Sequence, residues 1–267
     1  MKLIKMNVID KIIKNKKESV NISKKHTSPD TIKKDAIDYT STLSRKHEFQ
    51  DKLKDKSCQL ICEYKVASPS KGHISDLNIK DVIEVYDKSP VDMISILTEE
   101  SYFESNLKNL KEAKTYTKKP LLRKDFFIDE YMIYEAAIND ASCILLIEGV
   151  CPDIEEYLNI SCELGLDAIV ECHTIEDILN VEKYNPQIIG VNNRNLKDFT
   201  IDLETTKELK QYVPNYMISE SGVTCSEDAR LLKSYGADGI LIGSSILENN
   251  DKEKIDLYIN DLKKSLM

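Results

Sequence analysis

The sequence has few of the residues and segments that mark fibrous, membrane-bound or secreted chains. Only 8 of its 267 residues are glycine and 7 are proline, and neither is concentrated in a low-complexity segment. No apolar run approaches the roughly 18 residues that a membrane-spanning helix needs. Lys2, Lys5 and Asp10 interrupt the first ten positions, which the apolar core of a secretory signal does not tolerate. We therefore expect a globular protein of the cytoplasm that does not associate with membranes.

The spacings of common metal and redox sites are also missing. The seven cysteines are an odd number, and no two of them form a Cys-x-x-Cys pair. The four histidines include no His-x-x-x-His pair. Because zinc and thioredoxin-like sites rely on such pairs, we expect reduced, mostly buried thiols and no metal site.

The net charge of −9 is unevenly distributed along the chain. Residues 1–56 carry 15 Lys and Arg against 8 Asp and Glu, which is +7, and the remainder carries 22 against 38, which is −16. A basic arm can bind nucleic acid, but Val8, Ile9, Ile12 and Ile13 give this one a helix-like apolar pattern. We expect a helix that packs against the mouth of the main domain, and no nucleic-acid partner.

Short apolar runs alternate with amphipathic segments after residue 58. The runs start 21 to 33 residues apart, which is about the length of one strand, one helix and two loops. Eight such runs favour a parallel (β/α)8 TIM barrel over a doubly wound sheet, and the sequence lacks the Gly-x-Gly-x-x-Gly turn of a dinucleotide-binding fold. We predict one domain over residues 1–267, with a helical extension over 1–58 and a barrel over 59–267. Its predicted strands are 59–64, 92–97, 120–124, 143–147, 167–170, 188–191, 216–219 and 239–242.

Charged and small residues close the predicted strands, where a barrel carries its active site. Glu63 and Lys65 share one face of the first strand, which turns Cys62 toward the helices. Small residues after the last two strands suit a phosphate group held by backbone N–H donors. Taken singly, Glu63 and Lys65 could form a rim ion pair, and Lys124 and Asp125 a solvated pair. Together, charges gathered at strand ends favour an active site that takes a phosphorylated small molecule.

Seven ordered segments resemble the indole-3-glycerol-phosphate synthase family of tryptophan biosynthesis. The similarity runs from about residue 60 to 250. The segments that carry it are EYKVASPSKG (63–72), ISILTEESYF (94–103), LRKDF (122–126), IVECH (169–173), IGVNNRNL (189–196), ISESGV (218–223) and LIGSS (241–245).

This resemblance implies a carboxy-lyase that needs neither metal nor organic cofactor. The family closes the indole ring of 1-(2-carboxyphenylamino)-1-deoxyribulose 5-phosphate and releases carbon dioxide and water. By similarity, Lys124 is the general acid and Glu171 the general base, with Lys65 as a partner acid. Glu63 orients the lysines, and Asn192 hydrogen-bonds the sugar hydroxyls. We expect the nearby Lys65 to lower the pKa of Lys124.

The remaining site residues follow from the same resemblance. Arg194 and Lys65 are expected at the substrate carboxylate. The aromatic pocket would be lined by Phe103, Phe126, Pro69, Leu145 and Phe199, and the phosphate would lie on Ser68, Ser221, Gly222, Gly243 and Ser244, with Glu220 also at the substrate. His73 and His173 are left without a role. Ser105 and Asn106 stand where the family often has Gly-Ser, and Asn139 stands where it commonly has glycine, which puts the shape of these loops in doubt.

Two other functions fit parts of the sequence. A phosphoribosylanthranilate isomerase would need a cysteine in the barrel interior, and Cys62 is the candidate. A non-catalytic sugar-phosphate-binding barrel would keep the Ser-Gly loops but lose Lys124 and Glu171, both of which are present. We expect a monomer, and an association with other enzymes of the tryptophan pathway is possible.

Overall fold

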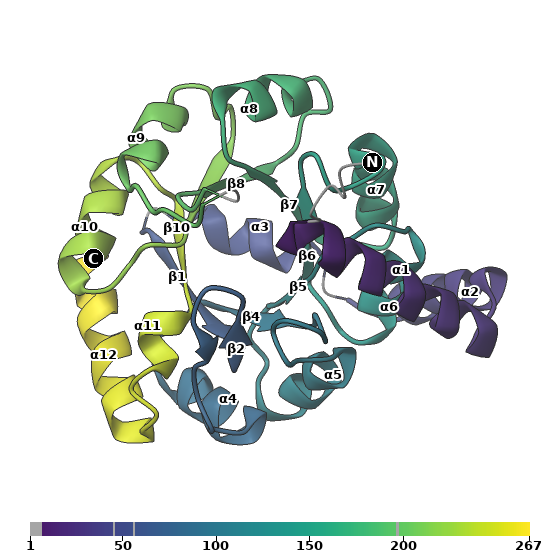
Figure 1. Ribbon diagram of the computed structural model, residues 1–267, viewed down its shortest axis with the longest axis horizontal. Helices are drawn as coiled ribbons and strands as arrows, with labels where there is room; N and C mark the ends of the chain where they lie inside the picture. The colour runs from purple at the N-terminus through teal and green to yellow at the C-terminus, as the bar shows by residue number, and fades with distance from the viewer. Residues whose placement is uncertain (1–6, 45, 56, 196–197) are drawn as a thin grey trace, which may run out of the picture.

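The computed structural model describes residues 7–44, 46–55, 57–195 and 198–267. Its eight long strands are parallel neighbours in a closed barrel of order β1-β10-β9-β8-β7-β6-β5-β4, with helices around the outside (Figure 1). The predicted (β/α)8 barrel is therefore confirmed, and closure excludes the doubly wound sheet. The strands are β1 (Gln59–Tyr64), β4 (Met93–Leu97), β5 (Leu121–Lys124), β6 (Cys143–Ile147), β7 (Asp167–Cys172), β8 (Ile188–Asn192), β9 (Tyr216–Glu220) and β10 (Gly239–Ile242).

The helices alternate with these strands after β1. They are α4 (Ile79–Lys88), α5 (Leu107–Tyr116), α6 (Tyr131–Ile138), α7 (Ile154–Glu163), α8 (Ile175–Glu182), α9 (Glu204–Lys210), α10 (Ser226–Ser234), α11 (Ser244–Leu247) and α12 (Lys252–Ser265). Side-chain oxygens at the N-caps of several helices accept backbone N–H groups of the first turn, as with Asn78 of α4 and Asp153 of α7. No helix among the described residues is long and apolar enough to span a bilayer.

Alternation along the strands divides the core into two layers. Ile61, Leu122, Ile169 and Ile218 belong to the cluster inside the barrel. The residues beside them in sequence, such as Cys62, belong to the larger cluster between the barrel and its helices. Because side chains two positions apart share a face, the same alternation decides which residues at the strand ends face the interior.

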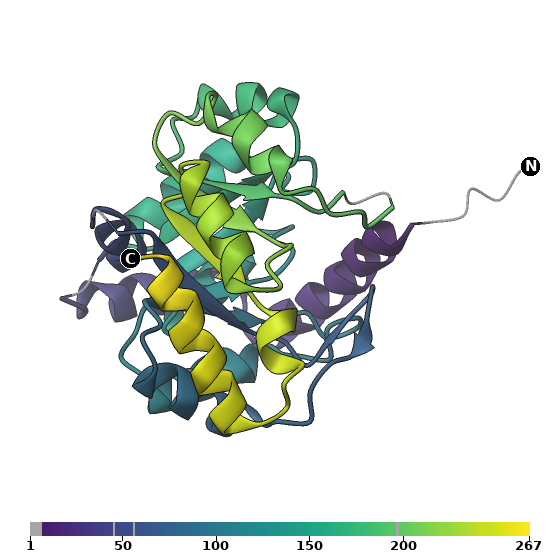
Figure 2. The same ribbon diagram turned by 90° about the vertical axis from the view of Figure 1, so that its left-hand side faces the viewer.

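The segment before β1 is helical in its described part, as predicted, whereas residues 1–6, 45 and 56 of the predicted extension lie outside the described residues. It contains α1 (Val8–His26), α2 (Pro29–Ser41) and α3 (Glu48–Leu53). Phe49 of α3 is fully buried in the interior cluster, and its backbone N–H donates to Oδ2 of Asp167 at the start of β7. Helix α3 therefore closes the amino-terminal end of the barrel, whereas Figure 2 shows α1 toward the opposite end.

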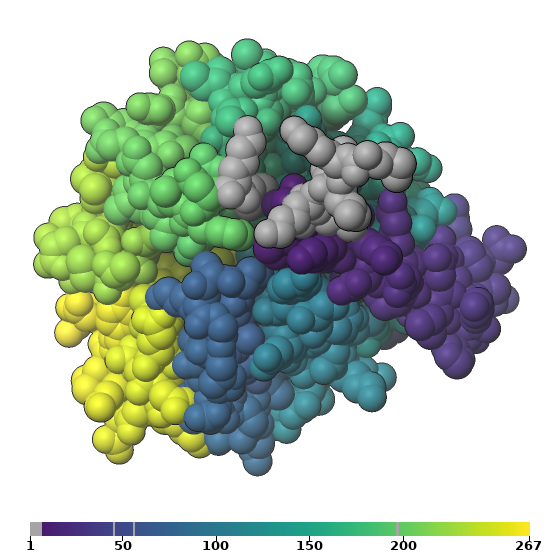
Figure 3. Space-filling view, viewed as in Figure 1, coloured from purple at the N-terminus to yellow at the C-terminus, as the bar shows by residue number. Residues whose placement is uncertain are grey.

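A small hairpin follows β1 and was not predicted. It pairs β2 (Ala67–Ser68) with β3 (Gly72–His73) in antiparallel fashion. Figure 3 shows α1 on the same face of the molecule as the segment that contains this hairpin. The loop after the first barrel strand and the N-terminal helix therefore share the end of the barrel where the predicted site lies.

Candidate active site

A cavity of about 440 Å³ opens at the carboxyl ends of the barrel strands. Every residue that the sequence analysis assigned to catalysis or substrate binding lines it. These residues come from all parts of the barrel and are Glu63, Lys65, Ser68, Pro69, Phe103, Lys124, Phe126, Leu145, Glu171, Asn192, Arg194, Phe199, Glu220, Ser221, Gly222, Gly243 and Ser244. Their individual roles stay predictions.

Strand alternation explains why the charged residues meet. Lys124 lies two positions after Leu122 on β5, and Glu171 lies two positions after Ile169 on β7, so each shares the inward face of its strand. Gly190 on β8 leaves room for Glu220, because a Cβ at this glycine would lie 2.5 Å from Oε1 of Glu220. The barrel interior thus changes from apolar to charged at its carboxyl end.

Lys124 is the centre of this charged cluster. Its Nζ lies 2.5 Å from Oε2 of Glu220 and 3.4 Å from Oε2 of Glu171. Lys65 is paired separately, with 2.7 Å between its Nζ and Oε1 of Glu63. The rim ion pair considered for Glu63 and Lys65 therefore exists, but it faces the cavity and Glu63 is only 2% exposed.

The expectation of a lowered pKa for Lys124 is wrong. Burial does lower it, but the negative charges of Glu220, Glu171 and Glu63 outweigh burial, and the pKa of Lys124 is raised. The positive charge of Lys65 is offset by its own partner Glu63. Lys124 is therefore an ammonium ion at neutral pH.

Glu171 and Glu220 share this ammonium group, and their pKa values move in opposite directions. Burial and the negative charge of Glu171 raise the pKa of Glu220 in spite of Lys124. Burial also acts on Glu171, but Lys124 and His173 outweigh it and lower the pKa of this carboxyl. The two carboxyls titrate as a pair, in which Glu171 is the more acidic member.

The amide of Asn192 connects the acidic cluster to the loop after β8. Its Nδ2 donates to Oε1 of Glu171 over 3.0 Å, and its Oδ1 accepts the backbone N–H of Arg194. The guanidinium of Arg194 donates to the backbone carbonyl of Phe199. Asn192 can thus orient the carboxylate of Glu171 while the same loop presents a cation and an aromatic ring to the cavity.

Small residues after β9 and β10 form another wall. Gly222 has a φ of +100°, and a Cβ there would lie 2.6 Å from Cδ2 of Leu203. A Cβ at Gly243 would lie 2.4 Å from Oε1 of Glu63. Gly222 therefore needs glycine for its backbone conformation and its packing, and Gly243 for its packing against Glu63, apart from any phosphate predicted here.

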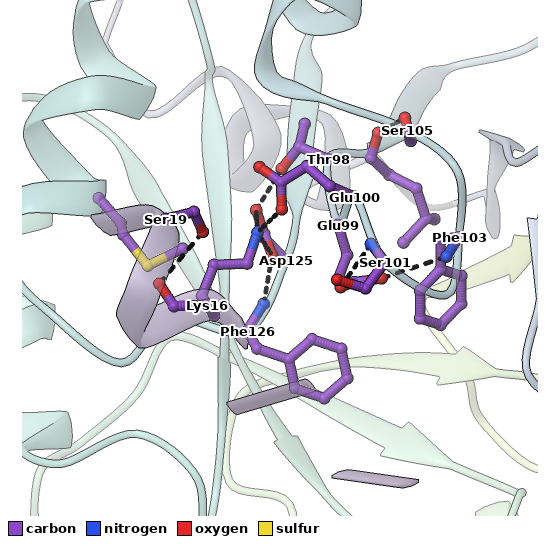
Figure 4. A network of polar contacts seen from close by, with 12 residues as sticks. Lys16, Ser19, Thr98, Glu99, Glu100, Ser101, Phe103, Ser105, Asp125 and Phe126 are labelled. Carbon is purple, nitrogen blue, oxygen red and sulfur yellow. Dashed lines mark hydrogen bonds and ion pairs between the residues drawn. The ribbon is translucent and has the colours of Figure 1, made fainter. Parts of the chain in front are cut away.

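Helix α1 contributes an apolar wall that the sequence analysis predicted only in outline. Val8, Ile9 and Ile12 line the cavity. One turn after Ile12, Lys16 is 3% exposed, and its Nζ lies 2.9 Å from Oδ1 of Asp125 and 2.8 Å from Oε2 of Glu100 (Figure 4). This buried pair holds the apolar end of α1 over the carboxyl ends of the strands.

Asp125 accepts from several of the side chains drawn in Figure 4. It is buried and paired with Lys16, which excludes the solvated ion pair considered for Lys124 and Asp125. Its side chain is fully buried, and its Oδ2 accepts from Oγ1 of Thr98 over 2.6 Å and from Nη2 of Arg123 over 3.3 Å. Lys16 was not predicted as its partner. The available signal was a lysine between Ile12 and Val20 on the buried face of α1, which requires a carboxylate partner.

The loops that depart from the family pattern keep regular roles. Oγ of Ser105 donates to the backbone carbonyl of Leu97, and Asn106 caps α5 by accepting from the N–H of Lys108. Asn139 ends α6 with a φ of −104°, which needs no glycine. The left-handed conformations fall at Glu104 and Asp140 instead.

Comparison with known proteins relates the whole barrel to one family. The family model "Indole-3-glycerol phosphate synthase" matches residues 9–257. A protein of that name from Leuconostoc mesenteroides is 45% identical over 218 residues, covering 79% of this chain and 83% of its own. Another from Methanothermobacter marburgensis is 39% identical over 253 residues, covering 94% and 90%.

Solved structures show the same fold at low sequence identity. A thiamine phosphate pyrophosphorylase from Pyrococcus furiosus has a TM-score of 0.60 and 15% identity, and covers 82% of this chain and 97% of its own. An N-acetylmannosamine-6-phosphate 2-epimerase from Clostridium perfringens has a TM-score of 0.61 and 15% identity, with coverages of 78% and 94%. These likenesses concern the barrel fold alone. The family model and the curated relatives show that the chain belongs to the indole-3-glycerol phosphate synthase family.

Proposed function

We propose that this protein is an indole-3-glycerol phosphate synthase. It closes the indole ring of 1-(2-carboxyphenylamino)-1-deoxyribulose 5-phosphate with loss of carbon dioxide and water. The observation that carries this proposal is the Lys124 ammonium, which faces the cavity between Glu171 and Glu220 beside the Lys65–Glu63 pair. A fixed acid next to fixed bases is what a condensation followed by a dehydration requires.

Each chemical step has a suitable group at the cavity. Ring closure develops negative charge on the ribulose carbonyl oxygen, and the protonated Lys124 donates a proton to it. Dehydration needs a base to remove a proton from carbon and an acid to protonate the departing hydroxyl, which we assign to Glu171 and Lys65. Glu63 holds Lys65 in place, and Asn192 holds Glu171.

Substrate binding divides between the two sides of the cavity. Arg194 and Lys65 offer positive charge for the substrate carboxylate, and Phe103, Phe126 and Leu145 provide an apolar surface for the aromatic ring. Loss of carbon dioxide is favoured where a carboxylate leaves water for an apolar surface. The phosphate is assigned to the wall formed by the residues after β9 and β10.

The competing isomerase does not fit this geometry. Its cysteine would have to face the cavity, but Cys62 is fully buried in the outer layer between barrel and helices, and burial raises the pKa of its thiol.

We also propose that the protein acts in the cytoplasm as a monomer on a phosphorylated small molecule. Gel filtration at assay concentration tests the oligomeric state.

The test is to add the carboxyphenylamino substrate to purified protein and to follow indole fluorescence. We expect turnover in the parent protein and a fall in kcat on the order of 10² or more in Lys124→Met and Glu171→Gln, because a positioned acid or base is lost. Lys108→Met, an exposed lysine of α5, is the matched control. Absence of turnover in the parent would refute the proposed function. Near-parental kcat in either site variant would assign the acid or base elsewhere.

A further inference from the structure

His173 is a buried imidazole beside the proposed base that the mechanism above does not use. It lies in the short connection between β7, which ends at Cys172, and α8, which begins at Ile175. Its backbone N–H donates over 2.8 Å to Oδ2 of Asp177, which also takes part in the capping box of α8. The backbone that carries the imidazole is therefore fixed by the start of the helix.

The imidazole and Lys124 lie on opposite oxygens of Glu171. Nε2 of His173 is 3.3 Å from Oε1, whereas Nζ of Lys124 is 3.4 Å from Oε2. Nε2 is buried and has no aligned hydrogen-bond partner among the described residues. The side chain is 14% exposed overall, so solvent reaches it at atoms other than Nε2. His173 is also outside the set of residues that line the cavity.

The proton balance of the reaction requires a route by which a proton from solvent reaches the active site. The substrate carries an ionised carboxylate and loses it as carbon dioxide. The acids supply one proton to the carbonyl oxygen and one to the departing hydroxyl, and the base recovers one proton from carbon. Each turnover therefore takes up one net proton from solvent, while Val8, Ile9 and Ile12 of α1 cover the cavity with apolar groups.

We propose that His173 is the relay through which the Glu171–Lys124 pair takes up this proton. The imidazole accepts a proton from solvent on its exposed side and becomes an imidazolium. The Nε2–H bond then breaks as an O–H bond forms on Oε1 of Glu171. Ring closure leaves the amine of Lys124 neutral while Glu171 is still a carboxylate. After a half-turn of the carboxyl group, the same proton passes to this amine, which restores both the ammonium and the carboxylate before dehydration. The proton that Glu171 then takes from carbon equals the one that Lys65 gives to the departing hydroxyl, so the net uptake is the single proton that passes through His173. This inference rests on the proposed function, because it accounts for that reaction's net proton.

The charges around His173 favour its protonated form. Burial lowers its pKa, but Glu171 on β7, Asp177 on α8 and Glu220 on β9 together outweigh burial and raise it. A raised pKa extends the pH range over which the imidazole carries the proton that the relay delivers. The relay should fail once the pH rises above the pKa of His173, because the imidazole then has no proton to deliver.

The first experiment compares His173→Asn with His26→Asn, which removes an exposed histidine at the end of α1. We expect kcat of His173→Asn to fall at least tenfold, with KM changed less than threefold. The basic limb that the parent shows in the pH dependence of kcat should be lost in this variant. Added imidazole should restore kcat in a concentration-dependent way. His26→Asn should match the parent in each respect.

Three results would overturn the relay. They are an unchanged kcat in His173→Asn, a change confined to KM, or a fall in kcat that imidazole does not restore. The last result would leave His173 a purely structural group beside Glu171. If the parent itself shows no turnover, the proposed function fails instead, and a second measurement decides whether the proton coupling exists.

This second measurement is an NMR titration of the His173 imidazole, which needs no turnover. We expect its pKa to be lower in Glu171→Gln than in the parent, since the neutral amide removes the negative charge next to Nε2. An unchanged His173 pKa in Glu171→Gln would show that the two groups do not exchange protons, and would overturn the relay whatever the activity.

Discussion

At the scale of single residues, the environment of Lys124 decides the chemistry of the site. A lysine buried alone loses its proton readily, but three carboxylates from β1, β7 and β9 raise the pKa of this one. The cluster as a whole leaves Glu220 with a raised pKa, because it lies close to Glu171 in a buried site. The protonation state of each residue in this cluster therefore depends on the charges of the other residues.

Replacement of Glu220 should change how stability depends on pH. An unfolded glutamate ionises near its ordinary value of 4.5, whereas the raised pKa of Glu220 keeps it protonated to higher pH in the folded protein. Between these two values the folded state binds more protons, so this group makes stability fall as pH rises. In Glu220→Gln this part of the slope should disappear in urea unfolding curves between pH 4.5 and 8. An identical slope in parent and variant would show that Glu220 is not the group that holds the additional proton in the folded protein.

Gly243 is predicted to be essential for the position of Glu63. A Cβ at this position would lie 2.4 Å from Oε1 of Glu63, and this oxygen forms the ion pair with Nζ of Lys65. Gly243→Ala should therefore displace Glu63 and lower kcat by about tenfold or more, as expected when an acid is misplaced. Gly239→Ala, at the start of the preceding strand β10, is the control, since its Cβ would meet nothing nearer than 3.3 Å. Equal activity of the two variants would argue against the ordering role of Glu63.

At the scale of secondary-structure elements, α1 is part of the site. Three side chains tie it to the loops after β4 and β5. Lys16 pairs with Glu100 and Asp125, Nδ2 of Asn15 donates to Oγ of Ser101, and Lys24 pairs with Asp129. The exposed contacts contribute little, whereas breaking a buried pair typically costs about 3–5 kcal/mol. The buried ion pair between Lys16 and Asp125 is therefore the contact that contributes most to the position of α1.

Lys16→Met should loosen α1 and weaken substrate binding. Asp125 keeps Thr98 and Arg123 as partners, so β5 and Lys124 should stay in place while Ile12 leaves the wall of the cavity. We expect KM to rise more than kcat falls, and the melting temperature to drop. Steady-state kinetics and thermal unfolding, with exposed Lys17→Met as the control, measure both effects. A parental KM in a folded Lys16→Met variant would show that α1 does not contact the substrate.

The loops after β9 and β10 can be tested for phosphate binding at Ser244. Gly222→Asp would be ambiguous, because its φ of +100° and the nearby Leu203 strain any side chain there. Ser244 is half-buried at the cavity, so Ser244→Asp adds a negative charge with less strain. We expect KM to rise at least tenfold and inhibition by inorganic phosphate to weaken, while exposed Ser234→Asp has no effect. Unchanged phosphate inhibition in Ser244→Asp would place the phosphate elsewhere.

At the scale of the whole molecule, barrel closure gathers charges from distant parts of the chain at one end. Lys65, Lys124, Glu171 and Glu220 span more than half of the sequence, yet they line one cavity. The opposite end is closed by α3, whose Phe49 fills the interior. The amino-terminal end of the barrel therefore serves stability through apolar packing, whereas the carboxyl end holds the charged residues of the candidate active site.

We expect turnover to be independent of divalent metal ions. The inward carboxylates are already paired with ammonium groups, as in Lys65–Glu63 and Lys124–Glu220, so a cation would have to displace them. After dialysis against excess EDTA, kcat should equal that of the untreated protein. Activity lost on dialysis and regained with one added divalent ion would contradict the mechanism proposed for Lys124.

The strand positions and the inward face at each strand end could be read from the chain, because both follow from local alternation of apolar residues. The predicted run 143–147 coincides with β6, and the run 167–170 falls two residues short of the end of β7, where Glu171 replaces an apolar residue. Such patterns extend over a few neighbouring residues and need no knowledge of the fold. The short β2–β3 hairpin has too few residues to produce one.

The protonation states and the long-range contacts depended on the folded chain. Lys16 and Asp125 are 109 positions apart, and their contact exists because α1 crosses the carboxyl end of a closed barrel. The pKa of Lys124 depends on carboxylates that three separate strands bring together, so the effect expected from Lys65 alone had the wrong sign. Electrostatic interactions act through space over a few ångströms, and local sequence patterns do not encode distances between remote residues.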